Sequence, residues 1–320
     1  MGKFRVGVIG CGGIAGTHLR AYRSNGVDVA AVADVDFARA QARAVECGAK
    51  AYADYVEMID KEGLDAISIC TPPAMHRDAA LAAFALGIPV LCEKPIARTV
   101  AEAREMVSAA AEAKTLLMTG FCHRYHGGIN RLKELMSNGA IGQPVAFRNR
   151  FATRIRNLES TWFVKPEISG GGVLLDNGVH SVDLFRYLCG EVVSSSARLR
   201  TILPGLVVED TAAMVLAGES GIVGTIELSW ATPGSDNVVA IYGTEGQAMV
   251  DYNAGELRYR KDGDSDWQIE PDQPPNRFHL EVANFLWCVE SGDKPRVEGH
   301  DGLRALEIIA EAYASASKAR

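Results

Sequence analysis

Residues 4–15 read Phe-Arg-Val-Gly-Val-Ile-Gly-Cys-Gly-Gly-Ile-Ala, an apolar run followed at once by a glycine-rich turn. The apolar run predicts a buried strand, and the amphipathic pattern from Ile14 onward predicts a helix. In this setting Gly10 allows a tight turn, and Gly12 lets the backbone approach a pyrophosphate. The unpaired N–H groups of the helix start, at Gly13 and Ile14, would bind that anion. The stretch therefore predicts a dinucleotide site at the end of the first strand.

A carboxylate in the expected place supports this interpretation. Asp34 follows the second predicted strand, residues 27–33, close to the ~20-residue offset at which an acidic residue accepts hydrogen bonds from the adenosine ribose hydroxyls. Such a carboxylate repels a 2′-phosphate, and neither Val35 nor Asp36 supplies a compensating arginine. NAD(H) is therefore favoured over NADP(H). The competing interpretation is that the glycines only make a turn and that Asp34 only caps the helix of residues 37–47.

Short apolar runs alternate with amphipathic helical runs through residues 1–122. Alternation at this spacing implies parallel strands joined by helical crossovers, and strands that are apolar along their length imply a sheet covered on both faces. We expect an α/β domain with a Rossmann-type, doubly wound parallel sheet. The predicted strands cover residues 4–9, 27–33, 66–70, 89–92 and 116–121, and the predicted helices cover residues 14–24, 37–47, 75–86 and 100–113.

The pattern changes over residues 123–320. Several strand-like runs within residues 191–269 are separated by short loops, which favour antiparallel hairpins over crossovers. We expect an α+β domain with an open, mainly antiparallel sheet for substrate binding and oligomerisation, whose terminal helices could pack back on the first domain. The predicted helices cover residues 129–137, 278–291, 302–318 and a segment that ends at Cys189, and a long strand covers residues 145–154.

The composition excludes several classes of protein. The 320-residue chain carries 33 basic and 40 acidic side chains, a net charge of −7, so no overall positive field attracts nucleic acid or anionic lipid. The longest apolar run, residues 79–92, is shorter than the ~20 residues of a bilayer span, and no signal-peptide pattern precedes the first strand. The seven cysteines are scattered, which is typical of reduced thiols. We expect a cytoplasmic globular protein with no nucleic-acid or membrane partner.

Three ionisable residues follow a second glycine-rich stretch at helical spacing. Asp176, His180 and Asp183 stand at positions i, i+4 and i+7, so one helix face would present two carboxylates and an imidazole. A histidine that titrates near neutral pH can take a hydroxyl proton while hydride leaves the same carbon. Lys94 follows a parallel strand at the sheet edge where ligands bind, and its ammonium group could stabilise alkoxide charge. The competing interpretation is that Lys94 is only a solvated surface charge and that His180 is only a structural residue of its helix.

Four motifs follow one another along the chain. They are the N-terminal glycine turn, residues 71–76 (Thr-Pro-Pro-Ala-Met-His), residues 93–95 (Glu-Lys-Pro) and residues 170–183, which match G-G-G-x-x-x-D-x-G-x-H-x-x-D. In this order they resemble the Gfo/Idh/MocA oxidoreductase family, which includes glucose–fructose oxidoreductase and inositol dehydrogenases. The resemblance implies a Rossmann domain followed by a strand-rich second domain.

The open face of the second sheet predicts an assembly. Such a face needs a cover, and another subunit would supply it, so we expect a homodimer or homotetramer formed through the second sheet.

The same resemblance implies roles for individual residues. Lys94, Asp176 and His180 match the family's catalytic residues, with His180 as the general base. His76 and Glu93 would border the nicotinamide ribose, although a first-turn residue such as His76 often only caps or packs. The bond between Lys94 and Pro95 would be cis. With the glycine turn, the candidate cofactor-binding residues are Gly10, Gly12, Gly13, Ile14, Asp34, Thr71, Pro72, His76, Glu93 and Lys94.

Candidate substrate contacts follow the sixth predicted strand and the second glycine-rich stretch. Arg124 and Tyr125 resemble the family's Arg-aromatic pair, although Gly127 and Gly128 stand where the family often has proline. Trp162 could wall a sugar pocket, or it could be a core aromatic residue. The candidate substrate-binding residues are Arg124, Tyr125, Trp162 and Asn177.

These observations predict an NAD(H)-dependent dehydrogenase or reductase that acts on a secondary alcohol or ketone of a sugar, a sugar derivative or a cyclitol, and the substrate class rests on the resemblance alone. Two alternatives stay open: an NAD-dependent glycoside hydrolase of the same family, and a non-catalytic NAD(H)-binding sensor, against which the catalytic set argues. His123 and His126 could be imagined as metal ligands with Asp176 and His180, but no motif fixes their partners, and we expect no metal site.

Overall fold

The computed structural model describes residues 4–272 and 275–317. The described chain divides into two compact units. The first contains residues 4–122 together with 275–303, and the second contains residues 123–272 together with 304–317. The segment that follows the second sheet therefore returns to the first unit, and the second unit is not one continuous stretch of chain.

A six-stranded parallel sheet forms the centre of the first unit. Its strands lie in the order β3-β2-β1-β4-β5-β6, so the strand order reverses at β1, and every neighbouring pair is parallel. The predicted doubly wound parallel sheet is confirmed. All residues of β1 and β4 are buried, as expected for strands covered on both faces. The strands are β1 (Val6–Ile9), β2 (Val29–Ala33), β3 (Lys50–Tyr52), β4 (Ala66–Ile69), β5 (Val90–Cys92) and β6 (Leu117–Thr119).

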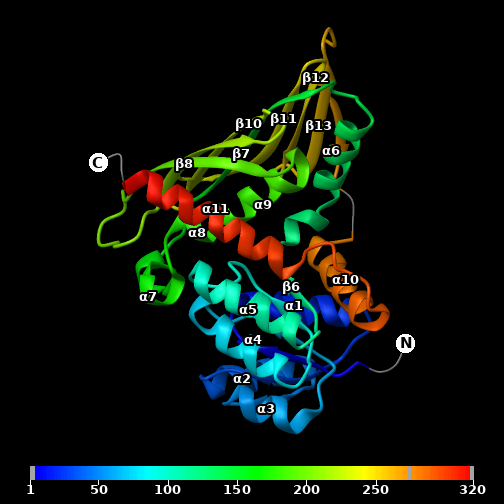
Figure 1. The fold of residues 1–320 in the computed structure, drawn as a ribbon, viewed down its shortest axis with the longest axis vertical. Helices are drawn as coiled ribbons and strands as arrows, with labels where there is room; N and C mark the ends of the chain where they lie inside the picture. The colour runs from blue at the N-terminus through cyan, green and yellow to red at the C-terminus, as the bar shows by residue number, and fades with distance from the viewer. Residues whose placement is uncertain (1–3, 273–274, 318–320) are drawn as a thin grey trace. The chain divides into compact units, whose positions relative to one another are not determined.

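Helices connect these strands, and Figure 1 shows them around the first sheet in blue to cyan. Side chains cap three of them: Asp36 accepts from an N–H of α2, Asp54 from one of α3, and Thr99 from one of α5. The cap of α2 is thus Asp36 and not Asp34, against the competing interpretation of Asp34. The helices are α1 (Gly13–Ser24), α2 (Phe37–Cys47), α3 (Tyr55–Glu62), α4 (His76–Phe84) and α5 (Val100–Glu112).

Two elements of the first unit have no counterpart among the predicted ones. Strand β3 has only three residues, which is too short for an alternation of polar and apolar residues to appear. Helix α3 has eight residues and is held by its Asp54 cap and by Gly63, which ends it in the left-handed conformation. Burial of Met58 and Ile59 stabilises this short helix more than its own sequence does.

An eight-stranded, mainly antiparallel sheet dominates the second unit, as predicted. The order is β14-β13-β12-β11-β7-β10-β9-β8, and only the pair β7 with β10 is parallel. Long strand β7 therefore lies between two strands that come much later in the chain. The strands are β7 (Pro144–Thr153), β8 (Val192–Arg200), β9 (Thr211–Gly218), β10 (Val223–Ser229), β11 (Ser235–Gly243), β12 (Gly246–Asp251), β13 (Glu256–Lys261) and β14 (Gln268–Pro271).

One face of this sheet carries the helices. Phe185 of α9 lies over β9 and β10, where a Cβ atom on Gly218 or Gly224 would come within 3.1 Å or 2.8 Å of its ring. Ser195 of β8 donates a hydrogen bond to the carbonyl of Ile308 in α11. Figure 1 shows α9 and the second-unit part of α11 on this face. The helices of this unit are α6 (Gly127–Ser137), α7 (Pro166–Ser169), α8 (Val173–Asp176), α9 (Gly178–Cys189) and α11 (Gly299–Ser317) from Arg304 onward.

The two long C-terminal helices are observed close to their predicted bounds. Helix α10 (Arg277–Ser291) packs on α1, where Ser24 and Asn25 hydrogen-bond to His279. Helix α11 begins at Gly299, three residues before its predicted start, and its predicted last residue, Lys318, lies outside the described residues. Among residues 4–272 and 275–317, no helix is long and apolar enough to cross a membrane.

Candidate functional site

The glycine turn follows β1 directly and opens α1. Gly10 has a φ of +89°, which favours glycine. A Cβ atom there would also lie only 2.7 Å from the backbone of Cys70 and Thr71, so close packing excludes any other residue. Gly12 and Gly13 differ, because a Cβ atom on either would meet nothing within 4 Å. The turn thus leaves open space beside the first N–H groups of α1, and Ile14 is the second residue of that helix. A pyrophosphate fits there.

The Asp34 carboxylate stands at the end of β2 beside this turn. Its Oδ2 accepts a hydrogen bond from the N–H of Cys11 at 2.8 Å, and its Oδ1 accepts from the N–H of Asp36 at 2.9 Å. These bonds fix the orientation of the carboxylate next to the glycines. Arg39, which no sequence motif indicates, lies beside it: its guanidinium is 3.7 Å from Asp34 and is 54% exposed. A cation therefore stands beside the carboxylate that would bind the adenosine ribose.

His76 ties together two loops at the carboxyl edge of the first sheet. Its Nε2 lies 2.8 Å from the carbonyl oxygen of Thr71, and its Nδ1 lies 3.0 Å from that of Pro95. The ring is completely buried, and burial lowers its pKa. Pro72 leads into the short 3₁₀ turn before His76, and the bond between Lys94 and Pro95 is cis. His76 therefore holds the loops that flank the site, in keeping with the packing interpretation.

The hydroxyl group of Thr71 is buried, and no atom of the described residues hydrogen-bonds to it. A buried hydroxyl without a partner is costly in a folded protein. Thr71 stands directly against Gly10 of the glycine turn. Together with the open space at Gly12 and Gly13 and the oriented Asp34 carboxylate, this hydroxyl fits a bound dinucleotide.

A buried ion pair lies beneath the end of β5. Nε2 of His18 lies 2.9 Å from Oε1 of Glu93, and Nδ1 of the same ring lies 3.1 Å from the hydroxyl of Ser68. Burial lowers the pKa of His18, but the Cys70 sulfur and the Glu93 carboxylate raise it more, to about 10. Burial likewise raises the pKa of Glu93, and His18 lowers it more. Both groups are charged at neutral pH, and Oε2 of Glu93 accepts from the N–H of Lys94 at 3.1 Å.

In the second unit, the carboxylate of Asp176 and the imidazole of His180 lie on an almost continuous helical path. The N–H of Asp176 bonds to the carbonyl of Gly172 at 3.0 Å, and the N–H of Ser181 bonds to that of Asn177 at 3.2 Å. Asn177 is the residue between α8 and α9, with φ and ψ of −94° and −30°, so the helical path barely breaks there. Asp176 and His180 therefore lie one turn apart on the same side.

An aromatic and histidine cluster packs against His180 through His123. The His123 ring lies edge-on to the His180 ring, with centroids 4.6 Å apart, and Nδ1 of His123 lies 2.8 Å from the Tyr252 hydroxyl. Phe151 stacks on His123 at 5.2 Å. No sequence motif indicates Tyr252 or Phe151, because the pairing of β7, β11 and β12 brings them here. Phe151 and Tyr252 therefore hold His123, and His123 packs against the imidazole of His180.

The candidate substrate residues have different surroundings. Arg124 forms a buried ion pair with Asp183, in which its Nε donates to Oδ2 at 2.9 Å. Tyr125 is 2% exposed and belongs to the core. Trp162 is partly buried and stacks on Phe163 at 4.0 Å between centroids. Asp183 is thus engaged by Arg124, and Arg124 is held in place by it.

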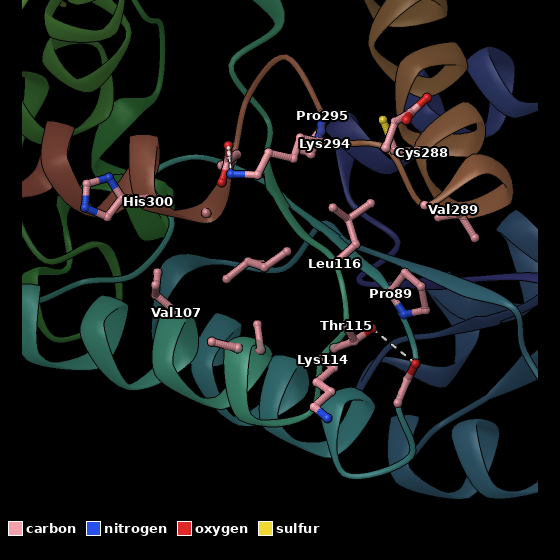
Figure 2. Close-up of a pocket in the computed structure, with 18 residues that line it drawn as sticks. Pro89, Val107, Lys114, Thr115, Leu116, Cys288, Val289, Lys294, Pro295 and His300 are labelled. Carbon is pink, nitrogen blue, oxygen red and sulfur yellow. Dashed lines mark hydrogen bonds and ion pairs between the residues drawn. The ribbon is translucent and has the colours of Figure 1, made fainter.

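A cavity of about 500 Å³ lies elsewhere in the first unit, and Figure 2 shows its lining. Pro89 and Leu116 line it just before β5 and β6 begin, so it lies at the amino edge of the sheet. Lys294 and Glu298, which both line it, form an ion pair at 3.5 Å. The glycine turn, Thr71 and Lys94 all follow the carboxyl ends of the strands. This cavity is therefore not part of the candidate cofactor site.

Comparison with known protein families covers both units. Residues 4–121 match the profile of an oxidoreductase family with an NAD-binding Rossmann fold. Residues 129–249 match the profile of the GFO/IDH/MocA C-terminal domain. The two matches follow each other in the order that the four motifs predict.

Similar proteins include named dehydrogenases of inositol and of sugars. The chain is 29% identical to a myo-inositol 2-dehydrogenase of Thermotoga maritima, over 94% of this chain and 93% of the relative. It is also 29% identical to a D-xylose 1-dehydrogenase (NADP(+)) of Haloferax volcanii, over 97% and 96%. Among solved structures, a levoglucosan dehydrogenase in complex with NADH and L-sorbose is 25% identical, with a TM-score of 0.93 over 99% of this chain and 98% of that one.

The buried pair of His18 and Glu93 predicts a pH-dependent contribution to stability. The folded-state pKa of His18 is raised from 6.5 to about 10, so its contribution is complete below pH 6.5 and is lost as the pH rises through 10. The folded-state pKa of Glu93 is lowered, so its contribution is lost as the pH falls below 4.5. We expect His18→Ala to lower the free energy of unfolding by about 3 kcal/mol at pH 6.5, because the substitution leaves a buried carboxylate without its partner.

Urea unfolding at pH 6.5 and at pH 10 measures this difference. The difference in free energy of unfolding between the wild type and His18→Ala should be smaller at pH 10 than at pH 6.5. His300→Ala, which removes an exposed histidine, is the control and should leave stability unchanged at both. A gap of the same size at both pH values would contradict the charged pair.

Proposed function

Because this chain belongs to the Gfo/Idh/MocA family of NAD-binding oxidoreductases, we propose that it transfers hydride between a nicotinamide dinucleotide and a secondary alcohol or ketone. The substrate class would be a sugar, a sugar derivative or a cyclitol, in line with the names of similar proteins. The observation that carries the proposal is the placement of Asp176 and His180 one turn apart on α8 and α9, within the glycine-rich motif of the family.

The chemistry needs a place for a proton as well as for a hydride. A bound nicotinamide dinucleotide would supply the hydride acceptor for the carbon that bears the hydroxyl group. His180 is the proposed general base that takes the hydroxyl proton, and it returns that proton in the reductive direction. Asp176 stabilises the imidazolium that forms, and the ammonium group of Lys94 donates to the reacting oxygen as negative charge develops there.

Two arrangements in the second unit support a defined orientation for His180. The ring of His123 packs edge-on against it, and the Tyr252 hydroxyl holds His123 in turn. Arg124 and Asp183, three residues further along α9, form a buried ion pair that anchors the same helix. We propose that Arg124 acts through this anchor, and that Trp162 and Asn177, which are partly buried, contact the substrate.

The dinucleotide would bind at the glycine turn of the first unit. Gly12, Gly13 and Ile14 would face the pyrophosphate, and Asp34 would accept hydrogen bonds from the adenosine ribose. Thr71 and Glu93 would lie toward the nicotinamide half, together with Pro72 and with His76 as a support. We propose a preference for NAD(H) over NADP(H), since Asp34 is oriented by two backbone N–H groups toward the turn.

The cytoplasm is the proposed location. All seven cysteines are among the described residues, and each is a free thiol. Several lie in buried strands or loops of the first unit, where burial raises the pKa of thiols such as Cys92. Unpaired, protonated thiols are typical of a reducing compartment.

Loss of His180 should abolish turnover without loss of cofactor binding. The assay follows absorbance of reduced nicotinamide with NAD⁺ and a panel of inositols, aldoses and uronic acids. We expect His180→Ala to lower kcat by at least about 100-fold, as general-base removal commonly does. NAD⁺ affinity, measured by calorimetry, should stay within about twofold, since the turn and Asp34 are intact.

The same assay separates the competing functions. Absence of net NADH formation, with hydrolysis of a glycoside that His180→Ala abolishes, would replace the dehydrogenase by the NAD-dependent hydrolase. NAD⁺ binding without any turnover by the wild-type protein would contradict an enzyme and support the sensor.

Cofactor preference should depend on Asp34 and Arg39. We expect Asp34→Ala to weaken NAD⁺ binding by about tenfold, because it removes charged hydrogen bonds worth about 1.5 kcal/mol. It should also improve NADP⁺ binding, since it removes the carboxylate that repels a 2′-phosphate and keeps Arg39, which then pairs with Asp36 alone. Adding Arg39→Ala should reverse that improvement. Asp54→Ala, which removes the cap of α3 in the same unit, is the control. Unchanged NAD⁺ affinity in Asp34→Ala would contradict the ribose role.

The face of the second sheet opposite to α9 supports a homodimer or homotetramer. Val215 and Val223, each 48% exposed, lie on neighbouring strands of this face. Glu227 on the same face bonds to Arg150 at 2.7 Å, so charged and apolar side chains alternate there. These valines alternate with Gly218 and Gly224, which face Phe185 of α9, so they point to the other side of the sheet, where another subunit can pack. We propose that a second copy of this chain covers it.

Sedimentation velocity at micromolar concentration tests this assembly. We expect a dimer or tetramer for the wild type and a lower mass for the Val215→Glu, Val223→Glu double variant, because it would bury charges at the interface. Glu57→Gln, on the exposed side of α3 in the first unit, is the control. A monomeric wild-type protein would contradict the proposal.

A further inference from the structure

One carboxylate holds the first turn of α8 from a distant part of the chain. Glu209 lies in the loop between β8 and β9, and its Oε1 accepts hydrogen bonds from the N–H groups of Gly172 and Leu174, each at 3.1 Å. Its backbone carbonyl accepts from the N–H of Val173 at 2.9 Å. Three consecutive N–H groups at the start of α8 therefore bond to one residue.

A tyrosine of the last helix completes this arrangement. The hydroxyl of Tyr313 in α11 donates to the same Oε1 of Glu209 at 2.6 Å. Glu209 and Tyr313 are both partly buried, and burial raises the pKa of Glu209 although all its donors favour the carboxylate. We call the bonds among Glu209, Tyr313 and residues 172–174 the Glu209 clamp. It joins α11, the β8–β9 loop and α8.

The clamp explains two of the three glycines before α8. A Cβ atom on Gly172 would lie 2.0 Å from the carbonyl oxygen of Glu209, and one on Gly171 would lie 2.4 Å from the Tyr313 hydroxyl. Neither glycine has a positive φ, so close approach and not backbone conformation requires them. Gly170 is different, because it ends α7 with a φ of +86°. Gly171 and Gly172 are thus the places where Tyr313 and Glu209 approach the chain.

The clamp sets the start of the helix that carries the proposed catalytic pair. Asp176 is hydrogen-bonded to the carbonyl of Gly172, one turn after the clamp, and α9 continues the path to His180. Val173 and Leu174 are completely buried, so the first turn cannot slide along its neighbours without loss of packing. A rotation or shift at residues 172–174 would move Asp176 and His180 together.

We propose that Glu209 is a positioning residue that fixes the rotation and register of α8 and α9, and thereby the places of Asp176 and His180. The proposal rests on the proposed function, in which these two residues act on the substrate. Glu209 touches none of the reacting groups in this role. Tyr313 contributes by holding the carboxylate of Glu209 against the glycines.

The neighbouring residue offers a matched control. Asp210 is completely buried, and its Oδ2 accepts from the N–H groups of Ile202 and Leu203 at 2.9 Å and 2.6 Å. Asp210 and Glu209 thus lie side by side in the β8–β9 loop, and each carboxylate accepts from two backbone N–H groups. The two donors to Asp210 belong to the loop itself, whereas those to Glu209 belong to residues 172 and 174. Loss of Asp210 should destabilise the loop and leave the start of α8 bonded to Glu209.

The experiment compares Glu209→Ala, Glu209→Gln and Tyr313→Phe with Asp210→Ala. We expect Glu209→Ala to lower kcat by about 30- to 100-fold, as a misplacement of about 1 Å does, with NAD⁺ affinity within about twofold. Glu209→Gln keeps an acceptor oxygen and should recover most of that loss, and Tyr313→Phe should fall between. The kcat of Asp210→Ala should stay within about threefold of the wild-type value, although its Tm should fall about as much as that of Glu209→Ala. An equal loss of kcat in Asp210→Ala would overturn the positioning role.

A second readout does not depend on turnover. In protein with isotope-labelled histidine, the imidazole of His180 is assigned by its disappearance in His180→Ala, and its titration is followed by NMR. A midpoint that moves in Glu209→Ala but not in Asp210→Ala supports the clamp even if the wild-type protein proves to have no oxidoreductase activity. An unchanged midpoint in folded Glu209→Ala overturns the clamp whatever the activity.

Discussion

The parallel pairing of β1 with β2 on one side and with β4 on the other is the constraint on which the cofactor half depends. The N–H of Gly10 bonds to the carbonyl of Ala33, and the N–H of Cys70 bonds to that of Ile9, each at 2.7 Å. These bonds bring the ends of three strands to one level, so the glycine turn, the Asp34 carboxylate and the Thr71 loop meet at one edge. Because Gly10 touches the backbone of the β4 loop, a larger residue there would separate all three.

Buried charges then give each unit its internal order. His18 and Glu93 pair beneath the end of β5, and Arg124 and Asp183 pair beside α9. Burial of a charge costs free energy that a close partner of opposite sign only partly offsets, so such pairs add little net stability. Each pair nevertheless favours one arrangement, because any other would leave a charge in the core without a partner. The first pair orders the backbone beside Lys94, and the second orders the helix that carries His180, so each pair stands next to a residue with a proposed catalytic role.

The glycine-rich stretches of the two units serve different physical ends. In the first unit, Gly12 and Gly13 leave room for a ligand, since nothing of the protein lies within 4 Å of a Cβ atom placed there. In the second unit, Gly171 and Gly172 admit the protein's own Tyr313 and Glu209. Similar runs of letters in a sequence therefore mark a binding space in one case and a packing contact in the other.

The sequence by itself determined the alternation of strands and helices, the glycine turn, the carboxylate at Asp34 and the helical spacing of Asp176 and His180, because each depends on residues close together in the chain. Only the tertiary structure decided which partners these residues have. Arg39, Tyr252 and Glu209 reach their sites through strand pairing and helix packing between segments far apart in sequence, and no local pattern encodes such contacts. Short elements such as β3 escaped prediction for the same reason, since neighbours and not their own residues stabilise them.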